Sequence, residues 1–217
     1  MTLGGYVINT KNRNFDQDAA SWDQLPRRVK VAQDIAQSMI RELSPTPDMD
    51  VLDFGCGTGL LALALQPFVR SVTGVDSSPG MLDVFETKIK EQHLSNVNAN
   101  HVDLDKGEVL TGSYHLIVSS MTLHHVKDIS LLLKQCYSIL LPSGLLAIAD
   151  LDLDDGKFHS NNDGVFHFGF DRAKLRKALS EAGFNNVQDI SAAEVEKETI
   201  NNEMRQFTLF LMTGKKV

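Results

Sequence analysis

The chain is poor in several features that mark whole classes of protein. It has two cysteines, Cys56 and Cys136, whose spacing matches neither a metal-ligand motif nor a disulfide scaffold. So few cysteines fit a reducing compartment, and we expect a cytoplasmic protein. No apolar run reaches about 18 residues, so no membrane span is expected. The first residues also lack the charged region and apolar core that are typical of a signal peptide.

An excess of positive charge is missing too. The formal net charge is −7, which argues against a nucleic acid as the main partner, because proteins that bind phosphate backbones usually carry a basic face. Residues 26–30 are the only locally basic segment, and we interpret them as the solvated start of a helix. With 217 residues, of which 42% are hydrophobic and 23% charged, the composition predicts one globular domain over residues 1–217.

Apolar residues recur at helical or strand spacing along most of the chain, and they predict strands that alternate with helices. The clearest helix covers residues 26–43 and ends before Pro45, whereas the polar residues 1–20 should be partly loose. Helices between the first five strands predict a mostly parallel sheet with helices on both faces. The last two strands have no helix between them and should form an antiparallel pair at one edge. The seven expected strands cover residues 49–54, 71–75, 97–102, 114–119, 145–150, 186–191 and 205–213.

The most informative segment is residues 51–61, where apolar residues lead into Asp53 and then into Gly55, Gly57 and Gly59. This pattern predicts a buried strand, a tight turn and the start of a helix. Glycine has no side chain and tolerates positive φ, so the main chain of such a turn can approach a ligand closely. A second acid, Asp76, ends the next strand, and the combination outlines a nucleoside-binding α/β unit.

Polar residues follow the ends of successive predicted strands. Because ligands in open α/β sheets bind beyond the carboxyl ends of the strands, these residues should form the rim of one crevice. They are Asp53, Asp76, Asp103, Ser119, Ser120 and Asp150.

Three of these acids have specific expected roles. The Asp76 carboxylate can accept hydrogen bonds from both hydroxyls of a ribose, although an acid that caps the following helix would give the same pattern. Asp103 can accept from an adenine amino group, with Leu104 offering an N–H, or it can be an ordinary loop acid. Asp53 should be partly buried, where it either holds the glycine turn or faces a ligand's ammonium group.

Four parts of the sequence belong together here: the run from Asp53 to Gly59, Val75-Asp76, Asp103 and Leu123-His124-His125. In combination they resemble class I S-adenosylmethionine-dependent methyltransferases. The resemblance is strongest to the small-molecule, single-domain type similar to the ubiquinone and menaquinone methyltransferases, and it covers about residues 20–185. It implies a Rossmann-like, doubly wound, seven-stranded sheet in residues 46–217, preceded by a lid segment and helix in residues 1–45. The implied activity is methyl transfer from S-adenosylmethionine to an O, N, S or C nucleophile of a small molecule by in-line displacement.

The same resemblance implies which residues bind the cofactor. The three glycines would cradle its methionine part, Asp76 its ribose, Ser77 and Met81 its adenosine, and Asp103 and Leu104 the adenine edge. Ser119 and Ser120 would lie beside the sulfonium. The expected cofactor-binding set is Asp53, Gly55, Cys56, Gly57, Gly59, Asp76, Ser77, Met81, Asp103, Leu104, Ser119 and Ser120.

Candidate bases come from two loops beyond the sheet. A base is needed only if the acceptor must lose a proton, and histidine titrates near neutrality. His124 and His167 are the two candidates, and each could instead be structural. Trp22, in a segment that resembles a lid in related enzymes, is expected over the acceptor together with His159 and Phe168, although Trp22 could equally pack in the core.

We expect no metal site. His159, Asp163 and His167 recur at four-residue steps that would suit one helix face, but Gly164 makes a regular helix doubtful. The acids between residues 150 and 155 are interpreted as solvated loop acids.

Two alternatives to a methyltransferase stay open at this point. A nicotinamide- or flavin-binding oxidoreductase usually has the turn G-x-G-x-x-G, whereas here Gly59 comes one position early and Leu60 takes the place of the last glycine. A domain that binds the cofactor without catalysis would carry the same turn.

Overall fold

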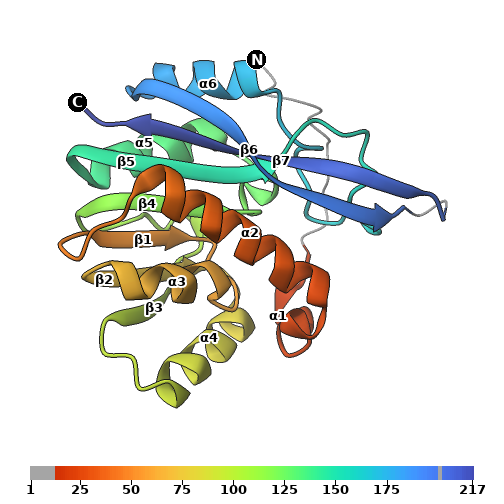
Figure 1. Cartoon of the computed structure of the whole chain (residues 1–217), viewed down its shortest axis with the longest axis horizontal. Coiled ribbons are helices and arrows are strands. Elements are labelled where there is room, and N and C mark those ends of the chain that lie inside the picture. The colour runs from red at the N-terminus through yellow and green to blue at the C-terminus, as the bar shows by residue number, and fades with distance from the viewer. Residues whose placement is uncertain (1–12, 200–201) are drawn as a thin grey trace.

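The computed structural model describes residues 13–199 and 202–217, which build one seven-stranded sheet of order β3-β2-β1-β4-β5-β7-β6 (Figure 1). The first five strands run parallel, and β7 is antiparallel to both of its neighbours, β5 and β6. The order steps outward from β1 in one direction and from β4 in the other, which puts a topological switch point between them. The strands are β1 Asp50–Phe54, β2 Ser71–Asp76, β3 Val97–His101, β4 Tyr114–Ser120, β5 Leu140–Leu151, β6 Asn185–Glu198 and β7 Met204–Lys215.

Helices cover both faces of the sheet. Side chains along a strand alternate between the faces, so Leu116 and Val118 of β4 pack in one apolar cluster and Ile117 packs in the other. Helices α2 Pro26–Leu43, α3 Leu60–Leu65 and α4 Pro79–Glu91 bury their apolar residues in the first cluster. Helices α5 Ile129–Ile139 and α6 Arg172–Glu181 do so in the second. The predicted α/β sheet, its antiparallel edge pair and its two covered faces are therefore confirmed.

Short elements connect this frame and shape its carboxyl edge. They are α1 Phe15–Ala19 and the 3-10 turns η1 Trp22–Gln24, η2 Gln66–Phe68, η3 Leu104–Lys106 and η4 Leu123–His125. No helix forms between residues 154 and 170, so the four-residue steps of His159, Asp163 and His167 do not put these residues on one helix face. Within the described ranges, we find no helix whose length and apolar character would suit it to span a membrane.

Three segments differ from the sequence-based expectation. Residues 15–19 are helical, because Asn14 caps the helix and Asp16 accepts hydrogen bonds from Ser78 and Gly80 at the start of α4; residues 1–12 lie outside the described part of the chain. Strand β5 begins at Leu140, before the expected strand of residues 145–150, and its pairing with β4 is irregular in this added part. Strand β6 continues to Glu198, because β7 pairs with it as far as Met204 (Figure 1).

Candidate functional site

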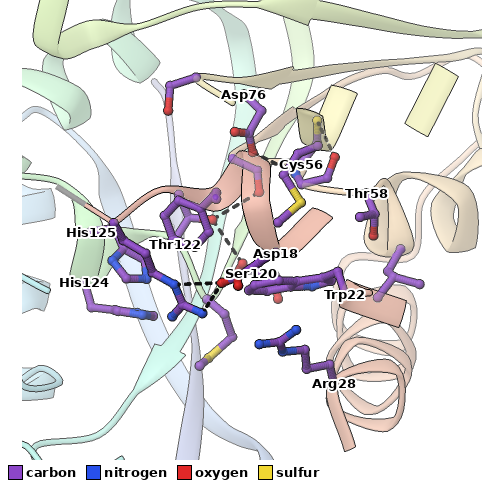
Figure 2. Close-up of a pocket in the computed structure, with 18 of the residues that line it drawn as sticks. Asp18, Trp22, Arg28, Cys56, Thr58, Asp76, Ser120, Thr122, His124 and His125 are labelled. Atoms are coloured by element: carbon purple, nitrogen blue, oxygen red, sulfur yellow. Dashed lines mark hydrogen bonds and ion pairs between the residues drawn. The ribbon is translucent and has the colours of Figure 1, made fainter. Parts of the chain in front are cut away.

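A cavity of about 850 Å³ lies beyond the carboxyl ends of β1, β2 and β4 (Figure 2). Its floor is the glycine turn after β1 and the acid that ends β2. The segment from Arg13 to Ala32, which contains α1, η1 and the start of α2, forms another part of its wall, together with residues 158–163. A volume of this size is typical of small-molecule and cofactor sites.

The glycine turn depends on positive φ at three positions, +70° at Gly55, +53° at Gly57 and +81° at Gly59. The carbonyl of Val75 accepts hydrogen bonds from the N–H groups of Gly55 (2.8 Å) and Cys56 (3.1 Å), which ties the turn to β2. A Cβ added at Gly55 would lie 2.2 Å from Thr122, and one at Gly59 would lie 2.0 Å from the ring of Phe85. At Gly57 the same Cβ would meet nothing within 4 Å, so this glycine faces open space along the cavity.

Asp76 closes the turn from the end of β2. Its Oδ2 accepts the N–H of Gly57 at 2.8 Å, and its Oδ1 accepts the N–H of Ser78 at 2.9 Å. Burial raises the pKa of this carboxyl, while hydrogen bonds from backbone N–H groups, first of all that of Ser78, act in the opposite direction. A carboxylate has about four acceptor positions, so two remain for ligand hydroxyls.

Asp53 is buried at the bottom of the cavity, with 1% of its surface exposed. Its Oδ2 has no hydrogen-bond partner among the described residues. Burial, and then the charge of Asp76, raise the pKa of Asp53 to about 7. A buried carboxylate oxygen without a donor fits a ligand that brings its own cation, such as the ammonium group of an amino acid.

Cys56 also lines the cavity, where it contributes an apolar surface and no reactive group. Burial raises the pKa of its thiol well above the ordinary value, so the thiol stays protonated at neutral pH.

Trp22 lies over the cavity and is held from two sides. The Arg28 guanidinium stacks on its indole, 3.7 Å from the ring centroid (Figure 2). Phe15 packs against the indole in a T-shaped arrangement, with the ring centroids 6.0 Å apart. The neighbouring Asp23 accepts a hydrogen bond from the Thr58 hydroxyl at 2.8 Å and pairs with the Lys88 ammonium at 2.5 Å.

These contacts join η1 to the glycine turn and to α4. Asp23, Thr58 and Lys88 give no signal in the sequence, because each residue has an ordinary polar character and only the fold brings the three together.

Histidines from two loops gather on another part of the wall. His124 is buried, and its Nδ1 donates to the buried carboxylate of Asp150 at 2.7 Å, while its backbone N–H donates to the other oxygen at 3.2 Å. Asp150 is therefore an interior residue and not the solvated loop acid that the sequence predicts. His125 donates through Nδ1 to the carbonyl of Gly164 at 2.7 Å.

His159 completes this group, with its ring centroid 4.9 Å from that of His124. Burial, and then the neighbouring His124, lower the pKa of His125 well below its usual value and that of His159 to about 2. Both rings are therefore neutral at pH 7.

The structure brings most of the predicted site residues to this one cavity. Asp103 is among them, but its carboxylate already accepts the Asp105 N–H at 3.0 Å and pairs with Lys106 at 3.0 Å. The predicted residues that line the cavity are Trp22, Asp53, Gly55, Cys56, Gly57, Asp76, Ser77, Met81, Asp103, Leu104, Ser120, His124 and His159.

Four predicted residues lie outside the cavity wall. Ser119 points into the interior and donates to the carbonyl of Phe54 at 2.9 Å, because strand alternation puts it on the opposite face from Ser120. His167 is buried and donates through Nε2 to the carbonyl of Val126 at 3.0 Å, so it does not reach an acceptor in the cavity. Gly59 packs under Phe85, and Phe168 packs over Gly156.

Comparisons with known proteins agree on one family. A model of the methyltransferase domain matches residues 24–189. An uncharacterized methyltransferase of Schizosaccharomyces pombe is 27% identical over 209 residues, which cover 87% of this chain and 74% of that protein. A ubiquinone biosynthesis O-methyltransferase of Coxiella burnetii is 35% identical over 105 residues, which cover 47% of this chain and 43% of that enzyme. The chain thus matches less than half the length of that enzyme.

The fold is also shared with solved structures. Phosphoethanolamine N-methyltransferase 2 of Haemonchus contortus, solved in complex with S-adenosyl-L-methionine, superposes with a TM-score of 0.67 at 14% sequence identity. The superposition covers 94% of this chain and 60% of that one.

Proposed function

The chain belongs to the S-adenosylmethionine-dependent methyltransferases, and from this premise we propose that its methyl acceptor is a small molecule held in the 850 Å³ cavity. The proposal depends on one observation about the cofactor site. The glycine turn is hydrogen-bonded to Asp76, and the Asp53 oxygen without a partner in the described part of the chain lies beside them at the bottom of the cavity. The cavity is walled by the chain's own N-terminal segment, which leaves room for a small molecule beside the cofactor. The net charge of −7 supports an acceptor other than a nucleic acid.

The residues of the turn have separate proposed roles toward the cofactor. Asp76 accepts from the ribose hydroxyls with its two remaining acceptor positions, and Asp53 accepts from the ammonium of the methionine part. Gly57 lets the backbone approach that part closely, because a side chain there would project into free space along the cavity. The adenosine lies against Ser77, Met81, Asp103 and Leu104, and Ser120 lies near the sulfonium end.

The cofactor supplies an activated methyl group, whose bond to the sulfonium sulfur breaks with its electron pair staying on sulfur. The chain's residues align the acceptor with this group and exclude water, which is the part of the rate enhancement that positioning provides. Trp22 and His159 enclose the acceptor from opposite loops. His124 is the candidate base among the predicted residues that line the cavity, since Asp150 fixes its Nδ1 proton and leaves Nε2 as the reactive nitrogen.

Two further parts of the proposal rest on the sequence. The two cysteines are free and buried, which supports a location in the reducing cytoplasm. Residues 1–217 are proposed to act as one domain.

Calorimetric titration of the purified protein tests the cofactor assignment. We expect one molecule each of S-adenosylmethionine and of S-adenosylhomocysteine to bind, because both carry the ribose and the amino acid ammonium that Asp76 and Asp53 recognise. NAD should not bind, because the turn lacks the spacing that seats a diphosphate. Binding of NAD in place of the sulfur nucleosides would overturn the proposal.

The variant Asp76→Ala should bind S-adenosylmethionine more weakly by about 1–3 kcal/mol, because a partly buried, charged hydrogen-bond acceptor is lost. The substitution also frees the N–H of Gly57. Asp83→Ala removes the same charge from an exposed position on α4 and is the matched control, with unchanged affinity. Equal affinities of the two variants would remove the ribose assignment.

A further inference from the structure

The fold brings together three histidines that the sequence does not connect. His124 and His125 belong to η4, directly after β4, and His159 comes from the loop after β5. One ring nitrogen of each lies within 4.8 Å of those of the other two, and the ring centroids are 4.1, 4.9 and 5.7 Å apart. All three line the cavity, and Figure 2 shows His124 and His125 side by side.

We infer that His124, His125 and His159 form a binding site for a divalent transition-metal ion of the zinc class. Three imidazoles with an open fourth position are the ligand set of many catalytic zinc sites. Imidazole also suits zinc, cobalt, nickel and copper, whereas magnesium and calcium prefer oxygen ligands. The geometry is close to what such an ion needs, since tetrahedral ligands at about 2.05 Å are about 3.3 Å apart, and nitrogens within 4.8 Å of one another must approach by about 1.5 Å at most.

The surroundings of the rings support this assignment. Metal-binding histidines usually donate their second ring N–H to a carboxylate or a backbone carbonyl, which fixes the tautomer and the ring orientation. His124 has such a partner in Asp150, at 2.7 Å, and His125 has one in the carbonyl of Gly164, also at 2.7 Å. In both residues Nδ1 is therefore occupied and Nε2 is left with its lone pair.

The third histidine lacks a partner where a metal would supply one. The Nε2 of His159 is buried and has no hydrogen-bond partner among the described residues. A buried polar atom without a partner destabilises the folded protein, and coordination to a metal ion would supply the missing partner.

Two cations act electrostatically on His159, namely Lys197 and Arg13. Their positive charge disfavours a metal ion without an anionic ligand, and it favours an ion whose open position carries an anionic oxygen. For this role, though not for the binding itself, the inference rests on the proposed function: the open position faces the cavity, where an ion would lower the pKa of an acceptor hydroxyl. The histidines would then act on the acceptor through the ion, and His124 would not take the proton itself.

Cobalt binding tests the site without cofactor or acceptor. The whole chain is treated with a chelator, freed of it, and titrated with Co²⁺, whose visible absorption is strong in a four- or five-coordinate nitrogen site. We expect one equivalent to bind and Zn²⁺ to displace it. His159→Ala should weaken binding by at least about 10–100-fold, the loss typical of even the outer partners of metal ligands.

The matched control is His93→Asn, which removes an exposed histidine at a positive-φ position that asparagine tolerates. It should bind cobalt like the wild type, and His159→Gln replaces His159→Ala if the latter does not fold. The inference is wrong if the wild type forms no one-to-one complex, or if the His159 variants bind as tightly as the control. Because no methyl donor is present, a failed cobalt titration leaves the methyltransferase proposal intact, and failed cofactor calorimetry leaves the metal site intact.

Discussion

Asp53→Asn should remove up to about 4 kcal/mol of pH dependence from the stability of the cofactor-free protein. The pKa of Asp53 rises from an ordinary value of 3.8 to about 7 in the folded state, because the carboxyl is fully buried. The folded protein therefore binds this proton more tightly than the unfolded chain does. The resulting stabilisation is complete below pH 4, is lost as the pH rises towards 7, and is absent above pH 7.

Denaturant titrations at pH 4, 5.5 and 8 measure this effect. The free energy of unfolding of Asp53→Asn, minus that of the wild type, should increase with pH, because the amide does not ionise. Asp83→Asn alters an exposed acid and should show no such trend. If the difference for Asp53→Asn were the same at all three pH values, Asp53 would not be the buried titrating group described above.

The same substitution connects stability with cofactor binding. A ligand ammonium beside Asp53 stabilises the ionised carboxyl, so wild-type affinity for S-adenosylmethionine should increase as the pH rises through 7. Asp53→Asn should bind more weakly at pH 8 and lose most of this increase.

Gly55→Ala should lower the free energy of unfolding by about 2–5 kcal/mol, whereas Gly57→Ala should lower it by only about 1–2 kcal/mol. Both glycines have positive φ, which costs other residues about 1–2 kcal/mol. Only at Gly55 does the added methyl group also meet a neighbour, the Thr122 side chain at 2.2 Å. Forcing such an overlap costs about 1–3 kcal/mol more.

Cofactor affinity should show the opposite order. The methyl group of Gly57→Ala projects into free space along the cavity, where the methionine part of the cofactor is proposed to lie. We therefore expect Gly57→Ala to fold and to lose affinity for S-adenosylmethionine in calorimetry. Wild-type affinity in Gly57→Ala would mean that the turn does not face the cofactor, and equal stability of the two variants would contradict the packing of Thr122 on Gly55.

Local sequence signals predict the frame of the molecule well. The sequence predicts a helix over residues 26–43, and the structure has a helix with the same ends. The signals are local, namely the apolar spacing and the prolines at its start and just after its end. The strands that contain Asp53 and Asp76 are equally clear, since in each case apolar residues lead directly into an acid. The extension of β6 to Glu198 is not predicted, because its pairing partner, β7, decides it.

The site residues also fall into those that the sequence predicts and those that depend on the tertiary structure. Asp53, the glycine turn and Asp76 could be predicted, since a positive-φ turn after a buried strand needs glycine and the fold type places both acids at one edge. The side on which Ser119 and Ser120 lie follows from strand register, and the burial of His167 follows from the path of a loop without regular structure.

The sequence by itself determined the order of strands and helices, the glycine turn and the acid at the end of the next strand, because periodicity and backbone conformation are properties of neighbouring residues. Only the tertiary structure decided that His159 joins His124 and His125, that Asp150 is buried behind them, and that Asp23 links Trp22 to Thr58 and Lys88. These residues come from segments far apart in the chain. Their meeting depends on how loops pack over the sheet, and that packing energy is shared by many contacts that no local pattern records.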